Sequence, residues 1–218
     1  MNKNTTPTTT RCCLASAFRP LPSVFGLLAL ALCLFAAGCS LPEAKSDTAR
    51  YYVLPSAAET ASPGPSAPRI GMFPVRTPDY LKPLSMAVGE GASEIHYFEN
   101  ERWAEPLDVG LTRVLTEHLS AAARVVRYPF SLEETRDYDV RVRVRTCEGT
   151  ADGRAIFSAT FEIYSAGANG ALVAQNTFTA KSAKWDGSDY ARLAELLGAD
   201  AAQLADAIAA AIPPLKKG

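Results

Sequence analysis

The sequence predicts an α+β fold, in which one mixed or antiparallel sheet carries two helices packed on one face. The clearest observation is a strict alternation of valine and arginine within residues 138–149, the pattern of a strand with one buried face. Turns at Ala151–Gly153 and Ala168–Gly170 then lead into two further alternating segments, so a C-terminal three-stranded antiparallel meander is expected. Apolar residues at helical spacing in 106–122 and 188–212 predict the two helices.

Four strands are expected before the first helix. Aromatic and β-branched residues predict strands at Arg50–Leu54 and Arg69–Val75, and Pro74 indicates that the second is an edge strand or contains a bulge. Leu84–Val88 and Ser93–Phe98 are expected to form a short hairpin, because the sequence Gly-Glu-Gly-Ala between them can turn the chain.

The first helix is predicted to begin at Pro106, because proline suits the first helical position. Asp108 would complement the helix dipole in the first turn. A short strand at Ala123–Pro129 should then run back along the sheet. The apolar stripe of this helix consists of Leu107, Leu111, Val114, Leu115, His118, Leu119 and Ala122.

Each strand of the meander should turn one face to the interior and the other to solvent. In the first strand, the inner face is expected to hold Val140, Val142 and Val144, and the open face Arg141, Arg143 and Arg145. The inner residues of the second strand would be Phe157, Ala159, Phe161 and Ile163. Those of the third strand would be Leu172, Ala174, Phe178 and Ala180.

The last helix is predicted to be capped by Asp186 or Ser188 and to stop at Pro213-Pro214. Its apolar face would consist of Leu193, Leu197, Leu204, Ile208 and Ile212.

The open arginine face of the meander has two interpretations. The simpler one is a solvated strand face whose arginines pair with Glu162 and its neighbours. The other is a docking face for an acidic partner or for lipid headgroups.

Residues 1–38 have the features of a secretory signal peptide. Residues 1–26 carry three basic side chains and no acid. The apolar run Leu27–Ala37 that follows is too short to span a hydrocarbon core of about 30 Å. We therefore expect these residues to be a cleaved leader.

The end of the leader resembles the lipobox of bacterial lipoproteins, with Ala37 and Gly38 before Cys39 and with Ala36 where leucine is commonest. The resemblance implies cleavage before Cys39 and acylation of its thiol and amine, which would hold the protein stably at a membrane. Ser40 replaces the aspartate that retains such proteins in the inner membrane, so the outer membrane's inner leaflet, facing the periplasm, is implied. The alternative is an ordinary buried cysteine after an unusual leader.

Composition limits the remaining chain to one domain without internal disulfides. Removing residues 1–38 leaves 180 of 218 residues, enough for a real core, and lowers the formal net charge from −1 to −4. An acidic chain argues against nucleic acid as a partner. Residues 39–49 would be a lipidated tether reaching at most about 35 Å, and 50–218 the domain, with Cys147 as its one thiol.

The sequence offers no recognisable catalytic or metal-binding motif. It contains no phosphate-binding loop, no GxSxG and no HExxH, and its two histidines are isolated. His118 is expected to be a core histidine, and His96 to lie in a strand. We therefore predict no catalytic residue, no metal and no cofactor.

Three strings are more specific than the fold requires: YYVLP at Tyr51–Pro55, PVRTPDYLKPLSM at Pro74–Met86 and NERWAEPLDVGLTRVLTEHLS at Asn100–Ser120. They resemble the ABC-type transport auxiliary lipoproteins, the paraquat-inducible protein C-like family, over roughly Arg50–Ile212. The resemblance implies a periplasm-facing subunit of an intermembrane lipid transport system, docking an MCE-domain bridge at the outer membrane. Its further partners would be a membrane permease and, in some systems, an ATPase.

The family motif maps to Pro78, Asp79, Tyr80, Leu81, Arg102, Trp103, Ala104, Glu105, Pro106 and Leu107. These residues have two interpretations: either Tyr80 and Trp103 fill the junction of sheet and helix while Arg102 and Glu105 pair, or the two aromatics form a protein-binding hot spot. The candidate partner-binding residues are Pro78, Asp79, Tyr80, Leu81, Arg102, Trp103 and Glu105.

Two other functions stay open at this point. One is a carrier that holds a lipid chain in a deep apolar pocket between sheet and helices, and the other is a regulator of an envelope enzyme. The sequence also leaves open whether the protein forms a homo-oligomer.

Overall fold

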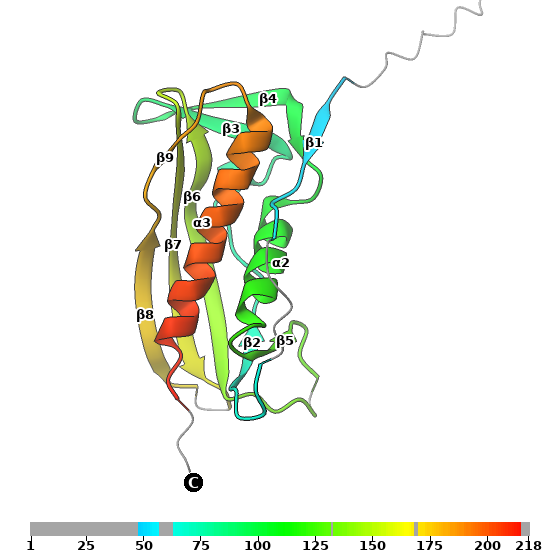
Figure 1. The fold of residues 1–218 in the computed structure, drawn as a ribbon, viewed down its shortest axis with the longest axis vertical. Helices are drawn as coiled ribbons and strands as arrows, with labels where there is room; N and C mark the ends of the chain where they lie inside the picture. The colour runs from blue at the N-terminus through cyan, green and yellow to red at the C-terminus, as the bar shows by residue number, and fades with distance from the viewer. Residues whose placement is uncertain (1–47, 57–62, 132, 168–169, 215–218) are drawn as a thin grey trace, which may run out of the picture. The chain divides into compact units, whose positions relative to one another are not determined.

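The computed structural model describes residues 48–56, 63–131, 133–167 and 170–214. The predicted leader and Cys39 lie outside the described residues. Within them, nine strands form one mixed sheet, and the helices α2 (Leu107–Leu119) and α3 (Tyr190–Ala211) lie side by side on one of its faces (Figure 1). The predicted α+β architecture is confirmed.

The strands are β1 (Arg50–Tyr52), β2 (Arg69–Met72), β3 (Ser85–Glu90), β4 (Glu94–Trp103), β5 (Arg124–Arg127), β6 (Tyr138–Thr150), β7 (Arg154–Ser165), β8 (Leu172–Thr179) and β9 (Ala183–Lys184). Along the sheet the order is β1-β4-β3-β6-β2-β5, and β7 flanks the other side of β6, followed by β8 and β9. The predicted hairpin is β3–β4 and the predicted meander is β6–β7–β8, both antiparallel. The contacts of β1 with β4, β2 with β5 and β6, and β3 with β6 are parallel.

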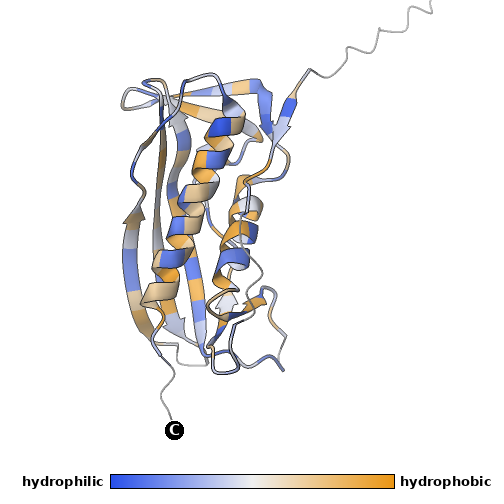
Figure 2. Ribbon diagram, in the orientation of Figure 1, coloured by the Kyte–Doolittle hydropathy of each residue, from blue (hydrophilic) through white to orange (hydrophobic). Residues whose placement is uncertain are grey.

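Hydrophobic and hydrophilic residues alternate along the long strands β6 and β7 (Figure 2), and these strands bury one face and expose the other. The valines at 140, 142 and 144 are at most 3% exposed, whereas the arginines between them are exposed. A bulge at Arg145 shifts the register, because Val144 pairs with Ala159 and Thr146 with Ser158. Beyond the bulge, Cys147 joins the buried face as a free thiol.

The prediction for the third meander strand is wrong at Leu172, which is 51% exposed. A register shift in β7 places Leu172 opposite Tyr164, although Ala174 still pairs with the buried Ile163. A shift of one residue moves a side chain to the other face of a sheet. Ala174, Phe178 and Ala180 do pack against the core.

Pro74 does not mark an edge strand, because β2 lies between β5 and β6. The segment after β2 stops pairing with β6 at Pro74 and pairs with it again at Arg76. The N–H of Arg76 donates to the carbonyl of Val142 (3.0 Å). Pro74 lies after the end of β2, and between the pairs Met72–Val140 and Arg76–Arg143 the chain has one residue more than β6.

Both helix starts differ slightly from the prediction. Pro106 precedes α2 as its N-cap, and its carbonyl accepts the N–H groups of Val109 and Gly110 at 3.0 Å. Helix α3 is capped by Asp189, which accepts the N–H of Arg192 at 3.0 Å. Asp186 serves the preceding turn instead, where it accepts two backbone N–H groups.

The interior between the sheet and the two helices is filled with side chains. Those at the centre are at most 1% exposed and come from all three surfaces: Leu111, Leu115, Phe157, Leu193 and Leu197. Burial of this kind supplies the main driving force for folding. No helix among the described residues has the length and apolar character to cross a membrane.

Candidate docking surface

The two motif strings, separated in sequence, meet at one end of the sheet. The string Pro78–Leu81 forms the short 3-10 turn η1 (Asp79–Leu81) before β3, and Arg102–Trp103 ends β4. The N–H of Trp103 donates to the carbonyl of Leu84 (2.7 Å). Strand β4 also reaches η1 directly, because the Tyr97 hydroxyl donates to the carbonyl of Tyr80 (2.8 Å).

Two of the candidate residues are part of the core. Leu81 is 4% exposed and Trp103 is 5% exposed, and both belong to the main hydrophobic cluster. Pro78 is half-buried at the start of η1. The burial of Leu81 and Trp103 favours a packing role for their side chains, and Trp103 agrees with the architectural interpretation of the motif.

Glu105 makes an ion pair, but its partner is Arg113 rather than Arg102. Arg113 donates to Glu105 Oε1 from Nη2 at 2.7 Å and from Nε at 3.2 Å. The same Nη2 donates to the carbonyl of Leu54 at 2.9 Å. This contact, which we name the α2 latch (Glu105, Arg113 and the Leu54 carbonyl), ties the start of α2 to the chain leaving β1. The expected Arg102–Glu105 pair is wrong, because Arg102 lies in β4 and pairs across to β1 and β3.

Arg102 and Tyr51 lie on the face of the sheet opposite the helices. Glu101 and Trp103 on either side of Arg102 are buried, and successive side chains of a strand point to opposite faces. Tyr51 pairs with Arg102 in parallel register and so shares its face. The Tyr51 side chain is 52% exposed.

Tyr97 extends this exposed face toward η1. Its neighbour Phe98 contacts Tyr190 of α3, with ring centroids 5.2 Å apart, so Tyr97 points away from the helices. A register shift in β4 between Phe98 and Arg102 puts Arg102 on the same face as Tyr97. Tyr97 is 42% exposed, and Asp79 is exposed beside it in an ion pair with Lys82 at 2.5 Å. We name the docking surface as the set Tyr51, Asp79, Tyr80, Tyr97 and Arg102.

Tyr80 covers a buried carboxylate on this face. Its hydroxyl donates to the Arg145 carbonyl at 3.2 Å and lies beside Glu148. Burial raises the pKa of Tyr80, and the neighbouring Glu148 raises it further. Burial likewise raises the pKa of Glu148, whose Oε2 has no hydrogen-bond partner among the described residues. The motif tyrosine thus separates an acidic group from solvent.

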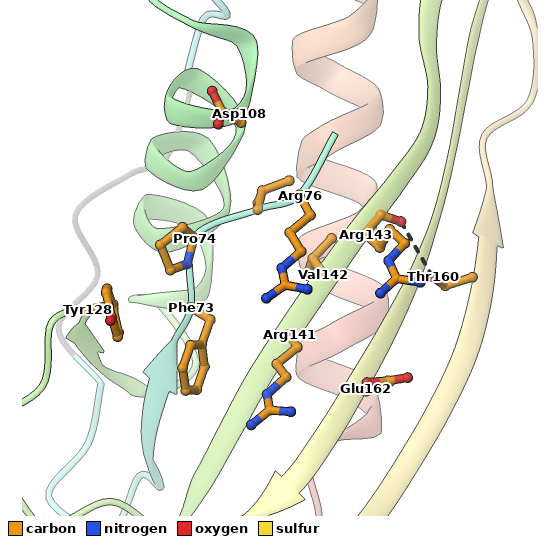
Figure 3. A pocket seen from close by; sticks show the side chains of 11 residues that line it. Phe73, Pro74, Arg76, Asp108, Tyr128, Arg141, Val142, Arg143, Thr160 and Glu162 are labelled. Atoms are coloured by element: carbon orange, nitrogen blue, oxygen red, sulfur yellow. Dashed lines mark hydrogen bonds between the residues drawn. The ribbon is translucent and has the colours of Figure 1, made fainter. Parts of the chain in front are cut away.

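A groove of about 640 Å³ lies farther along the same face, where residues 73–76 run beside β6 (Figure 3). We name it the arginine groove, because its basic side chains are Arg76, Arg141 and Arg143. Arg76 pairs with Arg143 in an isolated parallel bridge. Backbone hydrogen bonds from Arg76 to Val142 (3.0 Å) and from Val144 to Arg76 (2.8 Å) fix this pairing.

The expected pairing of the arginine stripe with Glu162 is not formed. Arg141 lies opposite Glu162 in register, but Glu162 Oε2 accepts a hydrogen bond from the Tyr164 hydroxyl at 3.0 Å. The Arg141 guanidinium instead lies over two aromatic rings, 5.0 Å from the centroid of Phe73 and 4.8 Å from that of Tyr164.

An aromatic cluster closes one end of the groove. Phe73 stacks on Tyr128 with centroids 5.6 Å apart, and Phe130 meets both rings edge to face. Tyr128 is 54% exposed. The guanidinium of Arg136 lies 3.9 Å from the Phe130 centroid and also bonds Asp139, which holds the cluster in place.

Sequence reasoning missed Arg76, Phe73 and Tyr97. Arg76 and Phe73 follow β2, and their place beside β6 depends on a parallel pairing that no local pattern announces. Tyr97 lies within the predicted hairpin, and alternation around Phe98 could have placed it on the open face. Arg76 also lies inside the family string at Pro74–Met86, which was the one available signal.

Two further clusters lie near these surfaces. A shallower groove of about 370 Å³ runs between α2 and the end of β2 and β5, beside the exposed Val109. At the tip of the β3–β4 hairpin, Glu90, Glu94 and His96 bring three potential ligand atoms within 4.8 Å of one another. All three are exposed, and His96 Nε2 forms a hydrogen bond of 2.7 Å with Glu90 Oε2, so contacts among these surface side chains account for the cluster.

Comparison with known proteins places this chain among lipoproteins of transport systems. Residues 52–209 match the family described as the ABC-type transport auxiliary lipoprotein component. The fold is similar to the crystal structure of an uncharacterized protein, at 22% identity over 75% of this chain and 97% of that one, with a TM-score of 0.61.

A second similar structure is that of the protein XCC0632 from Xanthomonas campestris, of the family DUF330, at 18% identity over 74% of this chain and 93% of that one, with a TM-score of 0.60. At these identities the likeness concerns the fold. No curated protein matches the chain. Because the family match spans most of the described domain, the chain belongs to the ABC-type transport auxiliary lipoproteins, components of transport systems in the cell envelope.

Proposed function

We propose that this protein is the lipid-anchored, periplasm-facing subunit of an intermembrane lipid transport system, and that it docks an MCE-domain bridge at the outer membrane. A permease and an ATPase would complete the system. Family membership supports a transport role. The observation that carries the docking role is the meeting of the two motif strings at one end of the sheet, beside the exposed residues of the docking surface.

The division of the chain belongs to the same proposal. Residues 1–38 are removed as a leader, Cys39 carries the acyl chains, residues 39–49 form the tether, and 50–218 form the domain. An extended tether of this length keeps the domain within about 35 Å of the membrane surface. The protein therefore works where a periplasmic bridge reaches the outer membrane.

The docking surface has the chemistry of a protein interface. Tyrosine and arginine are enriched among residues that dominate binding, and Tyr51, Tyr80, Tyr97 and Arg102 present both types on one face. The buried motif residues Leu81 and Trp103 would hold this face in shape from below. The motif thus combines packing with recognition, and we infer that the protein acts by binding rather than by catalysis.

The filled interior argues against a lipid carrier. An acyl chain held between sheet and helices needs an apolar cavity, but the side chains at that position are almost fully buried against one another. Both grooves described above lie outside this core.

Co-purification of the full, lipidated protein with the MCE-domain protein of its own system tests the proposal. We expect Tyr97→Ala and Tyr51→Ala to reduce the co-purified MCE protein about tenfold, because hot-spot truncations cost over about 1 kcal/mol. Tyr128→Ala, an equally exposed tyrosine outside the docking surface, is the matched control and should retain the partner.

Failure of the unaltered protein to bind any MCE-domain protein would contradict the proposal. Equal losses for Tyr97→Ala and Tyr128→Ala would instead place the contact elsewhere on the protein. The mass of the purified complex would also reveal whether more than one copy of this chain takes part.

A further inference from the structure

We propose that the arginine groove binds the phosphate-containing headgroup of an anionic phospholipid, with Arg76, Arg141 and Arg143 as the phosphate-binding side chains. This inference rests on the proposed function, because a component of a lipid transport system meets phospholipids at work. It adds a ligand site, on the open face of the sheet, that is separate from the docking surface.

The backbone places the three guanidinium groups together. Arg76 and Arg143 are partners in a parallel bridge, so their side chains leave the sheet side by side on the same face. Arg141 lies two residues before Arg143 on the same strand, about 7 Å away. Figure 3 shows the three guanidinium groups lining one groove, with the Phe73 ring beside Arg141.

The groove carries three basic side chains and two acidic ones, so it keeps an excess of positive charge. Among the described residues, no carboxylate lies within ion-pairing distance of Arg76, Arg141 or Arg143. The two acids of the groove form hydrogen bonds with neutral donors rather than ion pairs with the arginines, since Glu162 accepts from the Tyr164 hydroxyl and Asp108 accepts from the N–H of Val109.

Of the ten other arginines of the described chain, those at 69, 102, 124, 127 and 145 also have no carboxylate within ion-pairing distance, and five have acidic partners. Those at 50, 113, 136, 154 and 192 each pair with a carboxylate. Like charges placed side by side on a sheet are destabilising. Three arginines kept together without an ion-pair partner are therefore explained by an anion that binds them, and guanidinium groups bind phosphate oxygens in pairs of parallel hydrogen bonds.

The size and walls of the groove favour a lipid headgroup over a free phosphate ion. Its volume of about 640 Å³ lies within the usual range for small-molecule sites, roughly 300–1,000 Å³. A phosphate ion alone would leave most of this space to water. The aromatic wall of Phe73 and Tyr128 at one end suits the glycerol ester region of a lipid, because such rings favour the boundary between polar and apolar material.

Calorimetric titration of the full, lipidated protein in a non-ionic detergent tests the proposal with three probes. They are dihexanoyl phosphatidylglycerol, dihexanoyl phosphatidylcholine and inorganic phosphate. We expect the phosphatidylglycerol to bind at least tenfold more tightly than either of the others, and its affinity to fall with added salt. Partition of the lipids into the detergent is the same for every variant, so ratios between variants are unaffected by it.

Single substitutions identify the groove. Arg141→Gln, Arg143→Gln and Arg76→Gln should each weaken phosphatidylglycerol binding about tenfold, the cost of losing hydrogen bonds to a charged group. Arg145→Gln is the matched control, because it removes the same charge from the same strand face outside the groove, and its affinity should change less than threefold. Melting temperatures of all variants identify any that fail to fold. If one arginine variant fails to fold, the other two still test the groove.

Five outcomes would overturn the inference. Inorganic phosphate that binds as tightly as the lipid would make the groove a simple anion site, and equal binding of phosphatidylcholine would remove the role of charge. Equal effects of Arg145→Gln and Arg143→Gln would show a diffuse field rather than a site. Loss of the MCE-domain protein in Arg143→Gln, with lipid binding unchanged, would make the groove a protein contact. Retention of the MCE partner with no lipid binding would overturn this inference alone and leave the docking role intact.

Discussion

Asp200 is a buried carboxylate without a hydrogen-bond partner for one of its oxygens. It lies on α3 and is 4% exposed, and its Oδ2 has no partner among the described residues. Burial raises the pKa of Asp200 from 3.8 to about 6. The ionised form of this side chain therefore opposes folding at neutral pH.

The sign of the pH dependence follows from this shift. The folded pKa lies above the unfolded one, so the folded state holds the proton more tightly. The contribution of Asp200 to the free energy of unfolding should therefore be most favourable below about pH 4. It should fall between pH 4 and 6 and stay low above pH 6. We expect Asp200→Asn to be more stable than the parent at pH 7.5 by about 1–3 kcal/mol, a difference that vanishes near pH 4.

Urea denaturation of the purified protein at pH 4, 5, 6 and 7.5 measures this difference. Asp206→Asn on the exposed side of the same helix is the matched control, and its stability should follow the parent's at every pH. A destabilised Asp200→Asn at pH 7.5, or a gain independent of pH, would show that the Asp200 carboxylate is satisfied in the fold.

Trp103 and Tyr51 separate the packing and surface roles of the motif end of the sheet. Trp103→Ala should cost about 3–5 kcal/mol, because the indole is almost fully buried in the core. Tyr51→Ala removes a side chain that is half exposed and should change the melting temperature little. Calorimetric melts would decide this, and a stable Trp103→Ala would mean that the core tolerates the cavity.

At the scale of elements, the α2 latch joins the first helix to the first strand. Arg113 is 33% exposed and Glu105 is 28% exposed, so this ion pair is only partly screened by water. We expect a coupling energy of about 1 kcal/mol in a double-mutant cycle of Glu105→Ala and Arg113→Ala. The exposed pair Arg192–Glu195 on α3 is the matched comparison, and its coupling energy should be only a few tenths of the value for the α2 latch. Equal couplings at both pairs would mean that burial adds nothing to the latch.

The sequence predicted those elements whose signal is local. The alternation in β6 and β7 arises because one face of these strands is buried, and the apolar stripe of α2 arises because the helix packs on the sheet. Both patterns can therefore be recognised in the sequence. The exposure of Leu172 could not be recognised in the sequence, because it follows from a one-residue register shift between β7 and β8.

The site was predictable only in part. The residues of the family strings are visible in the sequence, yet their burial is not, since Trp103 is buried in the core whereas Tyr51 is half exposed. The arginine groove needed the parallel pairing of residue 76 with residue 143, which are far apart in the chain. Long-range pairing of this kind has no signature in local periodicity.

At the scale of the whole molecule, the proposed anchor decides where the protein works. Cys39→Ala should abolish acylation, because the thiol is the acceptor, and release the protein from the membrane or leave its leader uncleaved. Labelling with an alkynyl fatty acid, read on a gel beside Cys147→Ala as the control, checks this. Cys147 is buried, so its variant should keep full label. Undiminished label on Cys39→Ala would move the anchor to another residue.

The central claim, that the open end of the sheet docks an MCE-domain bridge, is tested most directly by site-specific photocrosslinking in intact cells. A photoreactive amino acid would replace Tyr51, Tyr97 or, as the control, Val173 on the exposed strand β8. We predict crosslinks to the MCE-domain protein from positions 51 and 97 and none from 173. Crosslinks from position 173 alone, or none to an MCE-domain protein from positions 51 and 97, would contradict the claim.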